Sequence, residues 1–459
     1  MRFSFKYAAL AAVCLTTMPT YATNGSFMPG FGVKSLGMGG VGIAMQEDAL
    51  SQVANPANAT ETGMRGDLGM TFFNPERRAA FGTSTGLVND NPSAAFGFNS
   101  GDDQSGNRLF LMPDMGFTMP LDSQISVGFA MAGLGGGGTV FKPNVMASPF
   151  FPNTSWPGAP LTAGDSAGID LMQLIAPVTV AYKLNPQHSV GASLNLAAQR
   201  FKANGLWTMG WFGGSGISAD RAHLTNQGYD YSFGAGLKLG WLGKFMDDRV
   251  SLGATWMSRT YMTEFDKYRG LFAEQGDLDF PENFGIGLSL KPTEKLTIAA
   301  DVVKVLYSDV ASMGNAGVGT GTANGGFLLV LGTLTLPGNP YRLGSDQGLG
   351  FGWEDMTVYK LGVSYDVNDD LTVRAGYNYA RSPINREQLV LSSLAPATTQ
   401  QHYSVGFTYQ MKGELDWEIS GVYMHVPRKE LSGCDQGVVD CITYSMKQDL
   451  LGIGFGVKY

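Results

Sequence analysis

The chain has 459 residues, of which 15% are charged, and a net charge of −8. Beyond its first 22 residues it contains no run of about 20 consecutive apolar residues, the length that a membrane-spanning helix needs, and this excludes a helical membrane protein. The basic residues are scattered instead of clustered, which argues against a nucleic-acid partner.

The first residues have the pattern of a secretory signal peptide. Two basic residues precede the apolar run Tyr7 to Leu15, and the sequence Thr20-Tyr21-Ala22 ends the leader. We expect residues 1–22 to be removed by cleavage, together with Cys14, so that the mature chain begins at Thr23.

A glycine-rich, nearly uncharged segment, Asn24 to Ala57, follows the leader. Glycine permits tight backbone and the close approach of other chain, as a segment packed inside a tube requires. Asp48 to Ala54 predicts one short helix. It should end at Asn55, because the following Pro56 disfavours helical backbone there and cannot donate a hydrogen bond. We expect residues 23–65 to form a plug, or hatch.

From Leu68 onward the sequence alternates with a period of two, with apolar or aromatic residues on one parity. The final strand is the clearest case, since Leu451, Ile453, Phe455, Val457 and Tyr459 alternate with glycines and Lys458. After a signal peptide, a terminal aromatic strand favours an outer-membrane barrel. The even strand count places both mature ends in the periplasm. Fourteen strands are predicted, at approximately Gly66–Arg78, Asn107–Met119, Gln124–Leu134, Ile169–Leu184, His188–Phe201, Tyr229–Trp241, Arg249–Tyr261, Asn283–Lys291, Lys295–Tyr307, Met356–Val367, Leu371–Arg381, Gln401–Met411, Leu415–His425 and Met446–Tyr459.

The second parity must face a polar interior. It carries Lys360, Asp366, Arg374 and Asn378 on two neighbouring strands, and a charge that faces lipid costs about 2–4 kcal/mol near the bilayer centre. The predicted fold class is therefore all-β: a fourteen-stranded antiparallel transmembrane β-barrel, residues 66–459, with the glycine-rich hatch inside its lumen. Short turns alternate with long connections, which we expect on the extracellular side, such as 135–168, 202–228 and 308–355.

The sequence offers little support for catalysis or a cofactor. Gly37 to Gly42 matches the dinucleotide pattern G-x-G-x-x-G, but no strand precedes it and no βαβ unit follows, so plug backbone is the better explanation. The four histidines lack metal-ligand spacing. His402 and Ser404 share the inward parity of one strand, as a lipase pair would, although this alternation is typical of lumen lining. We expect no cofactor, no metal and no enzymatic activity.

The long loops are unusually apolar, and contiguous exposed apolar area typically marks a binding site. Three loops together predict a capture groove for a hydrophobic ligand, with packing of the loops against one another as the alternative for any single residue. The groove residues would be Leu206, Trp207, Met209, Trp211 and Phe212 in one loop, Phe150, Phe151 and Trp156 in another, and the run Phe327 to Leu336 in a third.

The glycine run Gly133, Gly135, Gly136, Gly137 and Gly138 closes the third predicted strand. Glycines weaken a strand and permit bulges, so the wall would bend or part there, or the run would serve only as a flexible lead into the next loop. Both interpretations stay open.

A fatty-acid carboxylate would need a cationic partner in an otherwise apolar pocket. Arg200, Lys202 and Lys304 are candidates, each of which is also an ordinary residue at the level of the lipid headgroups. Cys434 and Cys441 lie close together in a polar stretch of an exported chain, so a small loop disulfide is expected.

The run Gly37 to Ala57, closing in Asn55-Pro56-Ala57, resembles the N-terminal hatch of the outer-membrane long-chain fatty-acid transporter (FadL) family, which includes members that take up aromatic hydrocarbons. The resemblance implies a fourteen-stranded barrel closed by a hatch. Hydrophobic molecules would pass through a loop groove and an inner pocket, then sideways into the membrane. By this resemblance Asn55, Pro56 and Ala57 occupy the hatch motif, and the run Gly133 to Gly138 lies near the family's strand kink.

We therefore expect a passive outer-membrane channel for hydrophobic compounds, with long-chain fatty acids as the first substrate class and movement of Thr23 to Phe27 opening the path. Monoaromatic hydrocarbons are the alternative ligands, and a surface adhesin or receptor barrel is the alternative of another class. The expected partners are the hydrophobic ligand, outer-membrane lipid and lipopolysaccharide, and the barrel-assembly machinery that inserts such proteins.

Overall fold

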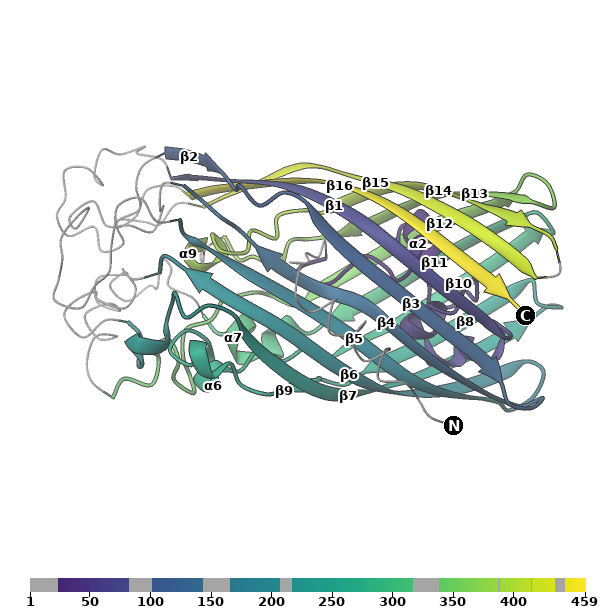
Figure 1. Cartoon of the computed structure of the whole chain (residues 1–459), viewed down its shortest axis with the longest axis horizontal. Coiled ribbons are helices and arrows are strands. Elements are labelled where there is room, and N and C mark those ends of the chain that lie inside the picture. Colours follow the sequence, from purple (N-terminus) through teal and green to yellow (C-terminus); the bar gives the residue numbers. More distant parts are fainter. Residues whose placement is uncertain are drawn as a thin grey trace.

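The computed structural model describes residues 24–81, 101–142, 166–206, 217–316, 338–386, 389–413, 415–433 and 442–459. Fourteen long strands in these residues form one antiparallel sheet that closes on itself, because the last strand pairs with the first (Figure 1). They are β1 (Arg65–Phe81), β3 (Phe110–Pro120), β4 (Ile125–Gly138), β5 (Gly168–Lys183), β6 (His188–Asn204), β7 (Asp230–Phe245), β8 (Val250–Met257), β10 (Asn283–Thr293), β11 (Leu296–Val305), β12 (Met356–Asp366), β13 (Leu371–Ala380), β14 (Gln401–Met411), β15 (Asp416–Gly433) and β16 (Ile442–Lys458). Two short strands, β2 (Gly101–Gln104) and β9 (Tyr261–Met262), pair with β1 and β7.

The predicted fold class is confirmed, and most strand boundaries lie within a few residues of those expected from the alternation. The largest difference is in β15, which runs to Gly433 and not to His425. Its register with β16 shifts between Val426 and Lys429, around Pro427. Proline cannot donate to the ladder and is tolerated at a bulge, and the bulge breaks the period-two pattern that the prediction followed.

Side-chain burial follows the predicted parity. On β16, Leu451, Ile453 and Phe455 are exposed, whereas the intervening glycines are buried. On β13, Arg374 and Asn378 are 8% and 0% exposed. The charged parity therefore faces the lumen, as predicted, and the apolar parity forms the outer surface.

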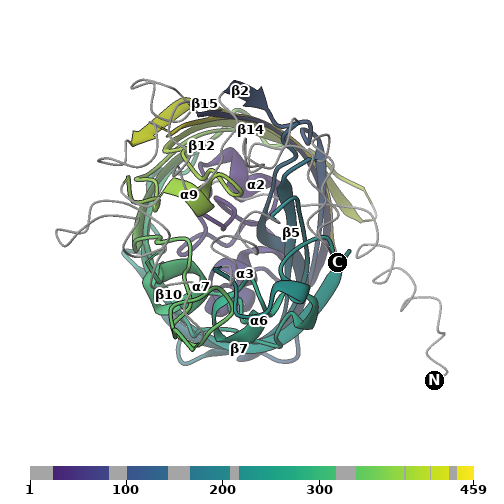
Figure 2. The ribbon, with the colours of Figure 1, turned by 90° about the vertical axis from the view of Figure 1, so that its left-hand side faces the viewer.

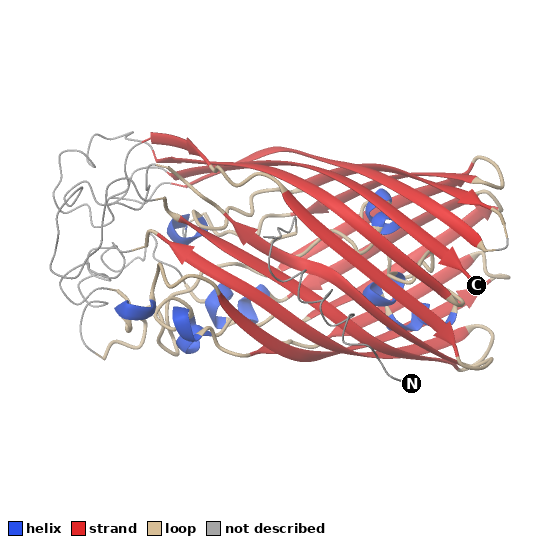
Figure 3. Cartoon of the chain, in the orientation of Figure 1, coloured by secondary structure: helices blue, strands red, loops and turns tan. Residues whose placement is uncertain are grey.

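The two ends of the barrel differ. Short turns and the C-terminal residue lie at one end, and the described parts of the long connections lie at the other, which we call the outer cap (Figure 3). Aromatic side chains pack against one another in the cap. The centre of the Phe201 ring lies 4.7 Å from that of Phe272 and 4.8 Å from that of Tyr268. Its short helical turns are η2 (Arg221–His223), η3 (Asp266–Tyr268), α6 (Ala273–Gly276), η4 (Tyr307–Asp309), α7 (Ala311–Gly314) and α9 (Leu389–Ser392). In the described ranges, every helix is too short to cross a membrane.

Residues 24–64, the N-terminal segment, lie inside the ring of strands (Figure 2). They contain α2 (Val33–Gly37), α3 (Ser51–Ala54) and the 3₁₀ turn η1 (Pro56–Thr60). The predicted helix ends at Asn55, whose backbone is extended as Pro56 requires, but it begins three residues later than expected. The sequence analysis did not predict α2 or η1.

Lumen-facing glycines let this segment approach the wall at backbone distance. A β-carbon on Gly376 of β13 would lie 2.0 Å from the nitrogen of Gly39, and one on Gly191 of β6 would lie 2.5 Å from the nitrogen of Ala57. On Gly253 of β8 it would lie 2.5 Å from a carbonyl oxygen of the segment. Any other residue at these positions would require the segment to move.

Candidate functional site

The motif Asn55-Pro56-Ala57 joins the N-terminal segment to itself and to the wall. The Asn55 amide is fully buried, and its nitrogen donates to the carbonyl oxygens of Ile43 and of Trp241 on β7, each at 2.9 Å. Its oxygen accepts from the Ala57 nitrogen at 3.1 Å. One side chain thus fixes two parts of the segment and one wall strand.

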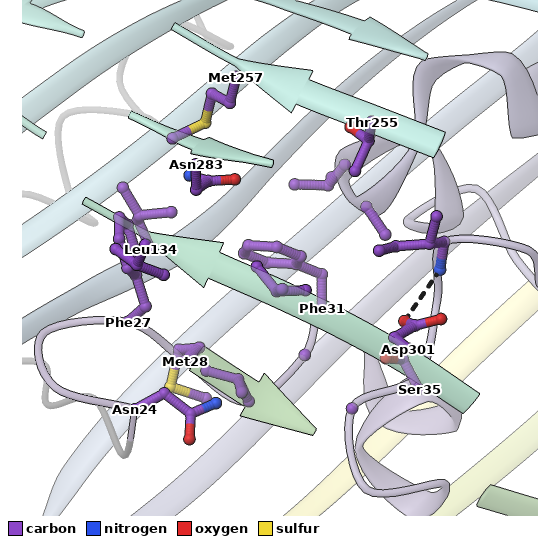
Figure 4. A pocket seen from close by; sticks show the side chains of 18 of the residues that line it. Asn24, Phe27, Met28, Phe31, Ser35, Leu134, Thr255, Met257, Asn283 and Asp301 are labelled. Atoms are coloured by element: carbon purple, nitrogen blue, oxygen red, sulfur yellow. Dashed lines mark hydrogen bonds between the residues drawn. The ribbon is translucent and has the colours of Figure 1, made fainter. Parts of the chain in front are cut away.

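A cavity of about 750 Å³, its opening included, lies between the N-terminal segment and the wall. Phe27 and Leu134 lie on one side of it, and Asp301 and Ser35 lie on the other (Figure 4). Most of the lining is apolar, from the segment and from five strands: Phe27, Met28, Phe31, Ile43, Val53, Leu134, Ile175, Met257, Val303, Val305 and Val358.

Two lysines and one aspartate also line the cavity. The Lys238 ammonium donates to the carbonyl oxygen of Val53 at 2.7 Å, and the Lys360 ammonium donates to that of Gly40 at 3.0 Å. Asp301 accepts from the backbone nitrogens of residues 42 and 43. Within the described part of the chain, no carboxylate lies within 4.0 Å of either ammonium group. Among the charged groups that line the cavity, the lysines thus outnumber the aspartate by one.

The three cations predicted from the sequence lie elsewhere, near the outer ends of their strands. Arg200 is buried 3.5 Å from Asp170, with its guanidinium carbon 4.3 Å from the centre of the Tyr229 ring. Lys202 lies over the same ring at 4.8 Å, and Lys304 is 3.7 Å from Asp355. None of the three lines the cavity.

Neither cavity lysine is among the cations expected from the sequence to bind a carboxylate. The parity of its strand places Lys360 in the lumen, and Lys238 occupies the inward parity of β7 by the same rule. Alternation alone does not say which inward side chains meet the cavity, because this depends on where the N-terminal segment lies.

The wall loses its pairing beside the glycine run. β3 pairs with β4 only from Met115 to Pro120, whereas it pairs with β1 from Phe110 onward. The pairing of β4 with β5 shifts register between Gly133 and Gly135, so a bulge lies where the glycine pattern allowed one. Pro113 lies in the part of β3 that has left β4, and its missing N–H suits a strand edge without a partner.

Residues 26–28 cover the edge of β4 that β3 leaves unpaired. Phe27 forms an antiparallel bridge with Gly135. The Met28 nitrogen donates to the Leu134 carbonyl at 2.9 Å, and the nitrogen of residue 136 donates to the Ser26 carbonyl at 3.3 Å. The same few residues thus cover the unpaired stretch of wall and line the cavity.

Other predicted site residues are placed as follows. Leu206 is fully buried in the apolar core of the outer cap. The other groove residues, namely Trp207, Met209, Trp211, Phe212, Phe150, Phe151, Trp156 and the run 327–336, lie outside the described residues, as do Cys434 and Cys441.

Within the described ranges, Ser404 forms hydrogen bonds with the N-terminal segment and not with a histidine. Its hydroxyl donates to the carbonyl of Gly37 at 3.1 Å and accepts from the nitrogen of Gly39 at 3.0 Å. Among the residues that the structure describes, no group of three or more His, Cys, Asp or Glu side chains could hold a metal ion.

A closed barrel of fourteen strands, with its own N-terminal segment in the lumen and an apolar cavity beside an unpaired stretch of wall, defines a transport channel of the outer-membrane β-barrel class. The chain belongs to the family described as outer membrane protein transport protein (OMPP1/FadL/TodX), whose model matches residues 15–459. The resemblance seen in the sequence is thereby confirmed. The family and the fold are those of transport channels, not of enzymes.

Solved structures support the fold. The toluene transporter TodX of P. putida is 16% identical, with a TM-score of 0.63 over 94% of this chain and 99% of that chain. A FadL homologue of Pseudomonas aeruginosa is 14% identical, with the same TM-score of 0.63 over 94% and 99%. The toluene transporter TbuX of Ralstonia pickettii is 18% identical, with a TM-score of 0.57 over 93% and 98%. A search among curated proteins gave no match.

Proposed function

We propose that the protein is a passive channel for hydrophobic compounds and that long-chain fatty acids are its principal substrates. The observation that carries this assignment is the composition of the cavity, which is apolar over most of its lining and holds two lysines and only one aspartate, Asp301, the cross-strand neighbour of Lys360. Such a cavity matches a molecule with a long apolar part and one negative charge.

The two lysines support a fatty acid over a neutral aromatic compound. A charge held in apolar surroundings is unfavourable unless it is paired, and a carbonyl oxygen compensates an ammonium group less well than a carboxylate does. A fatty-acid carboxylate would balance the one lysine that Asp301 leaves in excess. A neutral aromatic ring would fit beside Phe27 and Phe31 but would leave both ammonium groups as they are.

The route that we propose starts at the apolar loops of the outer cap and passes through the cavity. It leaves the barrel where β4 lacks β3 as a partner, beyond Met131. The outer cap would face the cell exterior, and the short turns and both mature termini would face the periplasm. Residues 23–65 would act as the hatch, with Asn55-Pro56-Ala57 as its fixed point on the wall.

The test measures uptake of labelled oleate and of labelled toluene by cells that lack their own fatty-acid channel and express this chain. The double variant Lys238→Met and Lys360→Met should reduce oleate uptake about tenfold or more, the value of one charge-assisted hydrogen bond, and leave toluene uptake unchanged. Lys304→Met is the matched control, because it removes a lysine that pairs with Asp355 outside the cavity.

Loss of oleate uptake in the Lys304→Met variant alone would move the carboxylate site to the outer end of β11. Uptake of toluene without oleate by the unmodified chain would assign it to monoaromatic hydrocarbons. A folded barrel that takes up neither compound would favour the adhesin or receptor alternative.

A further inference from the structure

The N-terminal segment is held in two different ways along its length. Its larger part, residues 32–64, which we call the plug body, is fastened to strands around the whole barrel. Lys34 pairs with Glu418 of β15, and Glu47 pairs with Arg374 of β13 at 3.1 Å. Asp301 of β11 accepts two backbone N–H groups of the plug body, at 2.8 and 3.1 Å. Because β7, across the barrel from β15, also holds it through Asn55, the plug body cannot move as a unit without breaking many buried bonds.

The gate segment, residues 24–31, is held by its backbone bonds to β4 and by one side chain of the outer cap. The hydroxyl of Tyr307, in η4, donates to the Asn24 carbonyl at 2.8 Å. It accepts from the Ser26 nitrogen at 2.9 Å and from the Ser26 hydroxyl at 3.3 Å. These three bonds fill the donor and acceptor capacity of a phenol hydroxyl. Burial raises the pKa of Tyr307, so the hydroxyl keeps the proton that it donates.

Tyr307 also fits the gate segment by shape. Its side chain is fully buried, and its ring lies 6.1 Å from that of Phe27. A β-carbon on Gly25, whose φ is +65°, would lie 2.5 Å from the Tyr307 hydroxyl. The gate segment therefore closes against Tyr307 only because residue 25 has no side chain.

The ring of Tyr307 is in turn positioned by the outer cap. Trp353 meets it edge to face, with ring centres 5.3 Å apart and an angle of 87° between the planes. The Trp353 ring lies 5.9 Å from that of Phe351, and the backbone nitrogen of Trp353 donates to the carbonyl of Met313 in α7. A ligand that rearranges these aromatic side chains from the outside would disturb the support of Tyr307.

From this geometry we propose that Tyr307 is the latch of the channel: it holds the gate segment closed over β4 and the cavity, and its release by rearrangement of Trp353 in the outer cap opens the path. This inference rests on the proposed transport function, since a latch has meaning only where a ligand passes. It assigns gating to a residue that touches neither the exposed edge of β4 nor Asn55.

The test uses hydrogen exchange of the folded, full-length mature protein, read on peptides of the gate segment and of the plug body. Tyr307→Phe keeps the ring and removes the hydroxyl with its three hydrogen bonds, so it should raise exchange in residues 24–31 at least about tenfold and leave residues 32–64 unchanged. Tyr268→Phe is the matched control, because the buried Tyr268 hydroxyl donates to the Gly228 carbonyl within the outer cap.

Gly25→Ala perturbs the latch from the gate side and replaces Tyr307→Phe if that variant does not fold. The Gly25→Ala, Tyr307→Phe double variant should show less than the sum of the single effects, because both act on one contact. Unchanged exchange in residues 24–31 of a folded Tyr307→Phe barrel would overturn the latch. Raised exchange there, with oleate and toluene uptake both unchanged, would keep the latch and refute the transport route instead.

Discussion

Gly376→Ala is the sharpest test of how the N-terminal segment seals the lumen. A β-carbon at this position of β13 would lie 2.0 Å from the nitrogen of Gly39 and 2.1 Å from the carbonyl carbon of Met38. Ordinary contact begins near 3.4 Å, so the two chains would have to separate by about 1.4 Å. Gly39 has little room to adjust, because its φ is +71° and the backbone of Tyr377 already lies close to its α-carbon on the other side: a β-carbon on Gly39 would lie 2.7 Å from the Tyr377 nitrogen.

The energetic effect follows from the bonds that such a separation breaks. Gly39 accepts a hydrogen bond from the Asn378 amide at 3.2 Å and donates one to the Ser404 hydroxyl at 3.0 Å. Both would pass the limit of a useful hydrogen bond. Overpacking costs about 1–3 kcal/mol and each lost bond about 1 kcal/mol, so the sealed state should lose about 3–5 kcal/mol. This corresponds to a factor of roughly 10² to 10³·⁵ in the equilibrium between sealed and displaced segment.

The assay is single-channel conductance of the purified protein in planar bilayers. Gly376→Ala should open at low voltage, while its mobility on unheated gels still shows a folded barrel. Gly66→Ala, on β1, is the control, since nothing lies within 4 Å of a β-carbon there. A Gly376→Ala barrel that folds and stays as closed as the unmodified protein would show that the glycine contacts do not maintain the seal.

Two further predictions concern the hatch motif and the outer cap. Asn55→Ala removes three buried hydrogen bonds and should lower the free energy of unfolding of the N-terminal segment by about 3 kcal/mol, measured by pulse proteolysis in urea; Asn55→Leu, which restores volume but no bonds, should not recover it. In the outer cap, burial and the neighbouring Asp279 raise the pKa of Asp277 to about 8. Because this value lies above the ordinary one of 3.8, the stabilising contribution is complete below about pH 4 and is lost as the pH rises through about 8. The protection factors of amides in residues 261–280, corrected for the intrinsic pH dependence of exchange, should therefore fall between pH 5 and pH 9. Asp277→Asn should flatten this fall, and an equally steep fall in that variant would point to another group.

The alternation of side chains sufficed to predict the barrel, because lipid on one face and the lumen on the other impose a period of two on every strand. It failed where that constraint ends. β15 continues to Gly433 beyond a bulge at Pro427, and β8 ends at Met257, four residues before its expected limit, with Tyr261 left to a separate short strand. These parts lie near the outer cap, where neither solvent nor neighbouring loops require alternation.

The cavity could not be predicted in the same way. Its lining joins residues as far apart in sequence as Phe27 and Lys360, and which inward positions meet it depends on the path of the N-terminal segment. The glycines that fix this path, such as Gly253 and Gly376, lie on the inward parity, and nothing in the sequence distinguishes them from other inward glycines. The resemblance of Asn55-Pro56-Ala57 indicated that a hatch exists, but not which part of it meets the wall through backbone and which through side chains.

That difference separates a fixed part of the segment from a movable one. The plug body meets Gly376 and Gly191 at backbone distance, and a contact between two backbones has no rotamer that can yield. The gate segment presents Phe27 and Met28 to the cavity, and such side chains can repack when a ligand displaces them. On the route that we propose, a hydrophobic ligand would therefore meet less resistance at the gate segment than at the plug body, even though both lie in one continuous stretch of chain. A seal and a path could then coexist in one lumen because different kinds of contact would hold them.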